Sequence, residues 1–157
     1  MIKVNFKDPA IWLATWFGCG LMRPAPGTWG TIGALPFGIL FLAWGGLPLL
    51  AVAVASVCMA GYWAAGRFED QAGEHDSGAI VIDEVAGMWI ALLPTALNIP
   101  LVVAAFLLFR LLDILKPWPI SWADKKLPGA IGVMMDDIIA GTFVAVLIVG
   151  ARLAGFG

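Results

Sequence analysis

The residues from 31 to 66 include no charged side chain. A helix needs about 20 consecutive apolar residues to cross the hydrocarbon core of a bilayer, so this run is long enough for two crossings. A Gly-Gly-Leu-Pro sequence at residues 45–48 interrupts the run and favours a turn over one continuous helix. The pattern predicts a hairpin of two membrane helices, about residues 31–44 and 47–65, of which the first is short for a span.

The composition of the whole chain points to the same class of protein. Of its 157 residues, 61% are hydrophobic and 13% are charged, and the mean hydropathy is +0.93. Soluble domains have about 45–50% apolar and about 25% charged residues. We therefore expect an integral membrane protein whose length fits a single domain, residues 1–157. A net charge of −2 provides no basic face, so no nucleic-acid partner is expected.

Four further segments are expected to be helical. They are about residues 11–21, 80–97, 101–115 and 136–153. The first has Trp12 and Trp16 on one helical face and is too short to span, which is typical of an interfacial or re-entrant helix. The second contains Pro94, which predicts a kink near its end. The expected fold class is all-α, a polytopic membrane bundle of about five membrane helices plus a short N-terminal interfacial helix.

Three polar or turn-rich segments are expected to form loops at one side of this bundle. They are residues 23–31, 67–77 and 117–135. Every Lys and Arg except Arg152 falls in or near the segments on that side. The positive-inside rule therefore predicts that the N-terminus and these loops lie in the cytoplasm.

Charged residues from three expected helices meet at this same membrane face. They are Asp83 with Glu84, then Arg110 with Asp113 and Lys116, and finally Asp136 with Asp137. Neighbouring residues on a helix point about 100° apart, so one acid of each pair can face a shared centre. Carboxylates are hard oxygen ligands of the kind that Mg²⁺ prefers. The candidate metal ligands are Asp83, Glu84, Asp113, Asp136 and Asp137.

The alternative reading of these acids is structural, as salt bridges with Arg110, Lys116 and Lys125. The sequence leaves open which acid of each pair binds a metal, and whether one or two ions bind. If the protein is an enzyme, the candidate catalytic residues are Asp83, Glu84, Asp113, Asp137 and His75. His75 is the only histidine, and the alternative for it is a solvated loop residue.

Two groups of residues are candidates for binding phosphate. Arg110 and Lys116 share a helix face with Asp113, and Arg offers a bidentate fork where Lys offers a point charge. For Lys116 the alternative is extension to the membrane interface. The second group is Gly27, Thr28 and Thr31, whose free N–H groups and hydroxyls at a helix start could bind an anion. A threonine-capped turn would have the same sequence.

Several phosphatase designs are excluded by the residues themselves. A single histidine excludes a histidine nucleophile assisted by a second one, and neither a Cys-x₅-Arg loop nor an Asp-x-Asp-x-Thr/Val motif is present. The chain also lacks the Gly-x₄-Gly-Lys-Ser/Thr loop of nucleotide-binding proteins. Metal-activated water is then the simplest nucleophile, with an adjacent carboxylate to accept its proton.

Four segments, in this order and spacing, resemble those of the phosphatidylglycerophosphatase A family of bacterial inner membranes. They are PAPGTWGT (24–31), HDSGAIVIDE (75–84), FRLLDILKPWPI (109–120) and GVMMDDIIAG (132–141). The similarity extends from about Trp12 to Gly150. One departure is Gly129-Ala130, where the family pattern has Gly-Gly, and it affects only the local turn.

The resemblance implies the all-helical, multi-pass fold of that family, and the positive-inside rule predicts that the active site faces the cytoplasm. It implies Mg²⁺-dependent hydrolysis of the membrane phospholipid phosphatidylglycerophosphate to phosphatidylglycerol and phosphate. The alternatives are a phosphatase or phosphotransferase for another lipid phosphate, or a small cation transporter, which would need a polar stripe across the bilayer. The pairs Ala86-Gly87 and Ala140-Gly141 favour close helix packing, within one chain or in a homo-oligomer.

Overall fold

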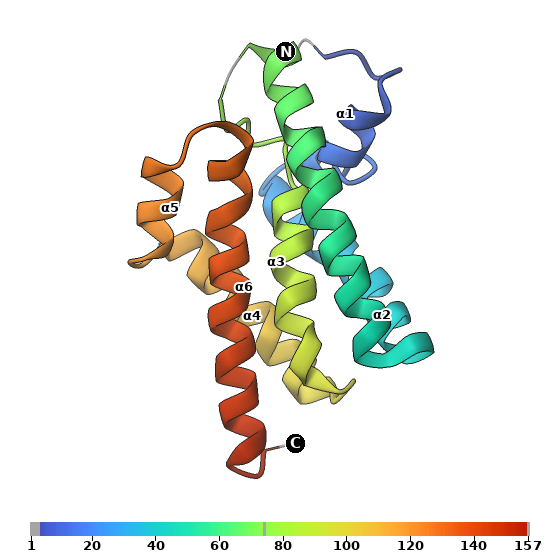
Figure 1. The fold of residues 1–157 in the computed structure, drawn as a ribbon, viewed down its shortest axis with the longest axis vertical. Helices are drawn as coiled ribbons and strands as arrows, with labels where there is room; N and C mark the ends of the chain where they lie inside the picture. The colour runs from blue at the N-terminus through green and yellow to red at the C-terminus, as the bar shows by residue number, and fades with distance from the viewer. Residues whose placement is uncertain (1–3, 74, 157) are drawn as a thin grey trace.

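The computed structural model of the protein describes residues 4–73 and 75–156, which form helices and connecting turns with no β-strand among them. The α-helices are α1 (Pro9–Ala14), α2 (Pro26–Ala72), α3 (Ile82–Leu92), α4 (Ile99–Leu115), α5 (Ile120–Lys126) and α6 (Gly129–Leu153). Two short 3₁₀ helices are η1 (Cys19–Leu21) and η2 (Leu93–Thr95). Figure 1 shows α3 in the centre of the bundle, between α2 and α6, with α4 behind. The all-α prediction is confirmed.

The predicted helical hairpin is present as the two arms of α2. The break is at Gly46, whose φ of 61° and ψ of −159° are not helical, so residues 26–45 and 47–72 form separate arms. Both arms are longer than predicted. The first begins at Pro26, because proline is well suited to the first turn of a helix, and the expected loop at residues 23–31 is therefore largely helical.

The second arm of α2 continues to Ala72, so the predicted loop at residues 67–77 is helical over its first half. Asp8 explains this extension. Its carboxylate accepts hydrogen bonds from Arg67 Nη2 at 3.0 Å and Gln71 Nε2 at 2.7 Å, which are one helical turn apart. The same carboxylate caps α1 by accepting from the backbone N–H of Ala10 at 2.9 Å.

The N-terminal helix is shorter than predicted, and its two tryptophans do not share a face. It ends at Ala14, and both Trp16 and Phe17 have left-handed backbone angles, with φ of 45° and 55°. Trp12 is 45% exposed, whereas Trp16 is 6% exposed and packs edge-on against Trp89. The Thr15 hydroxyl bonds back to the Ile11 carbonyl at 2.8 Å, a local bond that competes with helix continuation.

Three other boundaries differ from the sequence-based expectation. The helix predicted over residues 80–97 is α3, only 11 residues long, and it passes at Leu93 into η2, which contains Pro94. The last helix, α6, begins at Gly129 instead of residue 136, so it takes in part of the expected loop. That loop also contains the unpredicted α5 (Ile120–Lys126), which packs on α6. The helix predicted over residues 101–115 agrees with α4.

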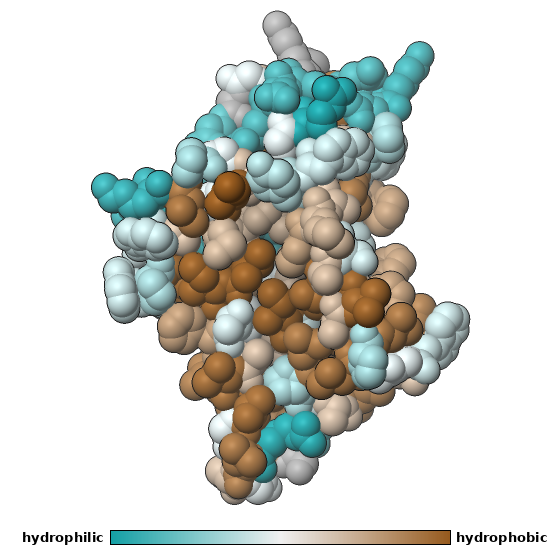
Figure 2. All heavy atoms as spheres, in the orientation of Figure 1, coloured by the Kyte–Doolittle hydropathy of each residue, from teal (hydrophilic) through white to brown (hydrophobic). Residues whose placement is uncertain are grey.

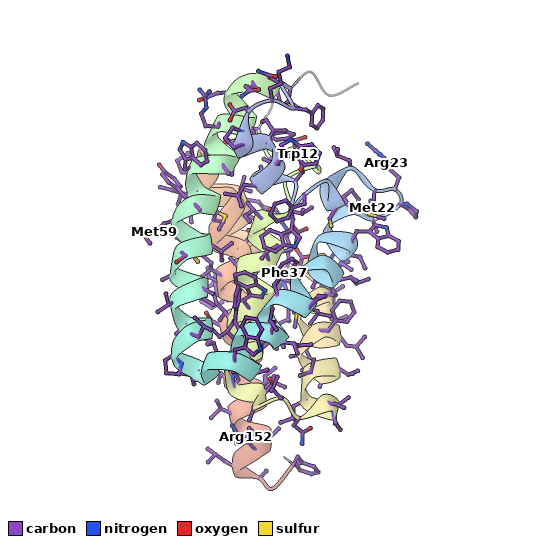
Figure 3. All side chains as sticks on the ribbon, turned by 90° about the vertical axis from the view of Figure 1, so that its right-hand side faces the viewer. Trp12, Met22, Arg23, Phe37, Met59 and Arg152 are labelled. Carbon is purple, nitrogen blue, oxygen red and sulfur yellow. The ribbon has the colours of Figure 1, made fainter. Side chains whose placement is uncertain are left out.

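Two helices in the described part of the chain, α2 and α6, are long and apolar enough to cross a membrane. The 11 residues of α3 and 17 of α4 are fewer than the roughly 20 that a full span requires, so the predicted count of five spans is not confirmed. The surface is compatible with a membrane protein. It is hydrophilic at one end and apolar over most of its length (Figure 2). Arg23 lies near the hydrophilic end and Arg152 near the other (Figure 3).

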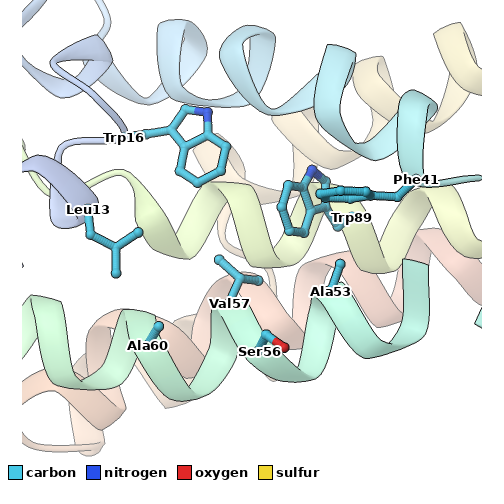
Figure 4. Close-up of a pocket in the computed structure, with 8 residues that line it drawn as sticks. All are labelled: Leu13, Trp16, Phe41, Ala53, Ser56, Val57, Ala60 and Trp89. Carbon is cyan, nitrogen blue, oxygen red and sulfur yellow. The ribbon is translucent and has the colours of Figure 1, made fainter. Parts of the chain in front are cut away.

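An apolar groove of about 350 Å³ lies between the two arms of α2, beside α1 and α3 (Figure 4). Phe41 and Trp16 both pack edge-on against Trp89, whose indole N–H donates to the Ala34 carbonyl at 2.9 Å. None of the residues that line the groove is charged. The groove therefore offers packing surface and no acid–base chemistry, which has to be sought on another side of α3.

Candidate active site

Two glycines bring the backbones of α3 and α6 into contact. A methyl group at Gly87 would lie 2.5 Å from the Phe109 ring and 2.6 Å from the backbone oxygen of Asp137. A methyl group at Gly141 would collide with the backbone of Gly87. The small residues predicted to favour close packing thus act within one chain, and they place the acids of α3 and α6 side by side.

Asp83, Glu84 and Asp137 form one group, which we call the three-acid cluster. One carboxylate oxygen from each lies within 4.8 Å of the others. Asp83 and Asp137 are 9% and 2% exposed, and the Glu84 side chain is 12% exposed. Within the described residues, Glu84 Oε2 and Asp137 Oδ1 are buried and have no hydrogen-bond partner. Buried carboxylate oxygens in this state require a cation or a proton.

Arg110 lies against the three-acid cluster and is held from several directions. Its Nη1 is 2.6 Å from Asp113 Oδ2 on the next turn of α4 and 3.9 Å from Glu84 Oε1. Nη1 also donates to the Thr31 hydroxyl at 3.3 Å, and that hydroxyl donates to the Gly27 carbonyl at 2.8 Å. The Nε–H of Arg110 is buried and has no partner among the described residues. The guanidinium is therefore fixed in orientation, with one buried donor that no described residue satisfies.

Gly27 allows the start of α2 to approach the side chains of Glu84 and Arg110. A methyl group at this position would collide with Glu84 Oε1 and would lie 3.2 Å from Arg110 Nη2. Thr28 is partly buried in the same first turn. The predicted Pro-Gly-Thr segment is thus at the site, but as a helix start and not as a loop, with Thr31 acting on Arg110.

Asp136 and Lys116 belong to a second group of charges beside the three-acid cluster. Lys116 follows α4 and donates to Asp124 of α5 and, at 2.7 Å, to Asp136 Oδ2 of α6. Asp136 Oδ1 accepts the backbone N–H of Asp137 at 2.9 Å. Burial alone would lower the pKa of Lys116, but its two carboxylate partners raise it well above the usual value, so the ammonium stays charged.

His75 lies outside the three-acid cluster. It follows α2, with its side chain 55% exposed, and its Nδ1 is 2.5 Å from Glu69 Oε1. The same oxygen accepts the backbone N–H of Asp76 at 2.9 Å. His75 therefore helps to fix the turn after α2, and Glu69, its partner, is not an acid of the cluster.

Apart from His75, the sequence-based candidates thus separate into two groups with distinct partners. The candidates at or beside the three-acid cluster are Asp83, Glu84, Asp137, Arg110, Asp113, Gly27, Thr28 and Thr31. Asp136 and Lys116 pair with each other instead. Asp124 was not among the candidates, because it was expected in an irregular loop. The signal that could have found it is its place four residues after Ile120, on a short amphipathic helix.

The chemistry of the three-acid cluster fits a small dication beside a phosphate. Three carboxylates without enough hydrogen-bond donors form a set of hard oxygen ligands, which suits Mg²⁺. An arginine with a free donor at the edge of this set is suited to a phosphoryl oxygen. The fold and the site define a helical, membrane-type protein with a carboxylate–arginine centre suited to phosphate esters.

The sequence of residues 12–152 matches the family model described as phosphatidylglycerophosphatase A. The chain belongs to this family, whose name denotes a phosphoric monoester hydrolase, and the predicted enzyme class is confirmed.

Three curated relatives cover nearly the whole chain. A phosphatidylglycerophosphatase A of Haemophilus influenzae is 36% identical over 93% of this chain and 90% of its own length. A protein of the same name from Escherichia coli K12 is 41% identical over 91% of this chain and 83% of its own. A putative phosphatidylinositol-3-phosphatase of Bacteroides thetaiotaomicron is 39% identical, with coverage of 89% and 91%. No solved structure matches the chain significantly.

Proposed function

We propose that this protein is a Mg²⁺-dependent phosphatase that hydrolyses phosphatidylglycerophosphate to phosphatidylglycerol and inorganic phosphate. The observation that carries the proposal is the three-acid cluster facing Arg110, in a chain of the phosphatidylglycerophosphatase A family. In the reaction the ester bond between phosphorus and the glycerol oxygen breaks, and an oxygen from water takes its place on phosphorus.

The metal ligands in this proposal are Asp83, Glu84 and Asp137. The unpartnered oxygens of Glu84 and Asp137 support this choice. Asp113 and Asp136, the other two predicted ligands, are each engaged by a cation, at 2.6 Å and 2.7 Å. We therefore assign them the role of orienting Arg110 and Lys116. When bound, Mg²⁺ would supply Lewis acidity toward the phosphoryl oxygens and activation of water.

The phosphate is bound on the side of the cluster where Arg110 lies. The free Nε–H of Arg110 donates to a phosphoryl oxygen, while Asp113 and Thr31 hold the guanidinium in place. The first turn of α2, which includes Gly27 and Thr28, adds the positive end of a helix dipole. The leaving glycerol oxygen takes its proton from water, since His75 is paired with Glu69.

We further propose that the enzyme lies in the bacterial inner membrane with this site at the cytoplasmic face. Two features support this orientation. Arg23 lies near the hydrophilic end and Arg152 near the opposite one (Figure 3), and the predicted topology puts the other positive charges on the side of Arg23. The acyl chains would then remain in the leaflet while the terminal phosphate reaches the site.

Phosphate release from a panel of lipids in detergent tests the function. We expect release from phosphatidylglycerophosphate and much less from phosphatidic acid. Phosphatidylinositol 3-phosphate belongs in the panel as a second candidate substrate, because one relative is named for it. Release from either of these lipids, without release from phosphatidylglycerophosphate, would overturn the choice of substrate.

Metal removal gives a separate prediction. EDTA is expected to abolish phosphate release, and Mg²⁺ in excess over EDTA is expected to restore it, because three buried carboxylates repel one another without a cation. Ca²⁺ is the matched control, since it prefers longer bonds and more ligands than Mg²⁺. Full activity after exhaustive dialysis against EDTA would contradict the metal proposal.

Replacing Arg110 by Lys is expected to reduce kcat/KM by about a hundredfold, because an ammonium cannot reproduce the fixed guanidinium fork. Arg67→Lys is the matched control. Arg67 is half-exposed and pairs with Asp8 at 3.0 Å, so this change should leave the rate within about twofold of wild type. Equal activity of the two variants would show that Arg110 does not bind the phosphate.

A further inference from the structure

Lys116 is at the junction of three helices. It ends α4 with φ of 43° and ψ of 57°, left-handed values that residues with side chains rarely adopt. The chain turns away from α4 at this point, and the Lys116 side chain reaches both neighbouring helices. It donates to Asp124 on α5 and, at 2.7 Å, to Asp136 on α6.

These two contacts determine where the rest of the ammonium group points. An ammonium has three N–H donors, of which two are used here, and the side chain is 31% exposed. Because the three donors are arranged tetrahedrally, two fixed contacts also set the direction of the third. Asp136 contributes one of these contacts through Oδ2, while its other oxygen, Oδ1, accepts the Asp137 N–H.

Asp124 is on a helix that is anchored in the core. Ile120 is 1% exposed and Ala123, the residue before Asp124, is completely buried, so α5 has little freedom to move relative to α6. The Asp124 carboxylate therefore offers a fixed acceptor to a flexible four-carbon stem. Without it, the Lys116 ammonium could swing about its remaining contact with Asp136.

We propose that Asp124 is a positioning residue for the phosphatase reaction. It holds Lys116 so that the remaining N–H donor is directed to a phosphoryl oxygen, and it does not touch the substrate itself. This inference rests on the proposed function and on the sequence-based prediction that Lys116 binds the substrate phosphate.

A double-mutant cycle tests the role, because a residue that acts only through Lys116 should have no effect once Lys116 is gone. Asp124→Ala is expected to reduce kcat/KM on phosphatidylglycerophosphate by about tenfold. In a Lys116→Met background the same change should cost less than about twofold. Asp124→Glu keeps the charge on a longer stem and should recover part of the loss. Asp70→Ala, at an exposed acid on α2, is the matched control.

Two outcomes would overturn the inference. One is wild-type activity in Asp124→Ala, and the other is an equal loss in both backgrounds, which would mean that Asp124 acts independently of Lys116. If Asp124→Ala does not fold, the same double-mutant cycle with Asp124→Asn tests whether Asp124 acts through Lys116, since Asn keeps the size of the side chain and loses its charge. Failure of the proposed function is separate, because the wild-type enzyme itself would then release no phosphate from this lipid.

Discussion

Asp137→Asn is expected to reduce turnover of phosphatidylglycerophosphate by about a thousandfold while the protein remains folded. Asp137 is 2% exposed and one of its carboxylate oxygens has no partner. Its negative charge can therefore bind a metal, and it destabilises the folded protein when no metal is bound. Asn keeps the shape and removes the charge. Without Mg²⁺ the variant should therefore unfold at the same temperature as the wild type or at a higher one.

Thermal unfolding with and without Mg²⁺ provides a second readout of this prediction. Added Mg²⁺ should raise the unfolding temperature of the wild-type protein and have much less effect on the variant, because only the intact cluster binds the ion well. The control is Asp70→Asn, which changes an exposed acid. An Asp137→Asn protein that turns over at the wild-type rate would show that the three-acid cluster is not the metal site.

Gly87→Ala is expected to destabilise the contact between α3 and α6 strongly. The new methyl would lie 2.6 Å from the backbone oxygen of Asp137, which cannot rotate away as a side chain could. We expect a loss of at least about 2 kcal/mol in the free energy of unfolding. We also expect about a hundredfold loss of activity, because the acids of α3 and α6 would be pushed apart.

Gly150→Ala is the matched control, since it adds the same methyl group to the same pair of helices. Gly150 is also a helical glycine, but a methyl group there would meet nothing within 4 Å. That change should be neutral or should stabilise the protein by about 0.5–1 kcal/mol, because alanine favours helix. Similar behaviour of the two variants would show that α3 and α6 do not touch at Gly87.

The meeting of acids from three helices could be predicted from the sequence, because the order of apolar runs places those helix ends at one face. The sequence could not predict which acid of a pair joins the three-acid cluster and which pairs with a lysine. Asp136 and Asp137 are equivalent in sequence, yet about 100° of helical rotation gives them different partners, Lys116 for one and the three-acid cluster for the other.

Helix ends were the least predictable part of the fold, because long-range contacts determine them. The second arm of α2 continues through charged residues since Asp8, 59 residues away, accepts a hydrogen bond from Arg67. For the same reason α5 was missed: it has seven residues, too few for a clear hydrophobic period, and its burial against α6 stabilises it.

The contact between Gly87 and Gly141 also has a consequence for biosynthesis. The three-acid cluster needs Asp137 of α6, which is synthesised after α2, α3 and α4, and Arg110 is held by Thr31, 79 residues earlier in the chain. A partly synthesised chain that has inserted α2 and α3 therefore lacks both the third carboxylate and the oriented arginine. With the site residues proposed above, hydrolysis should therefore begin only after α6 has packed against α3.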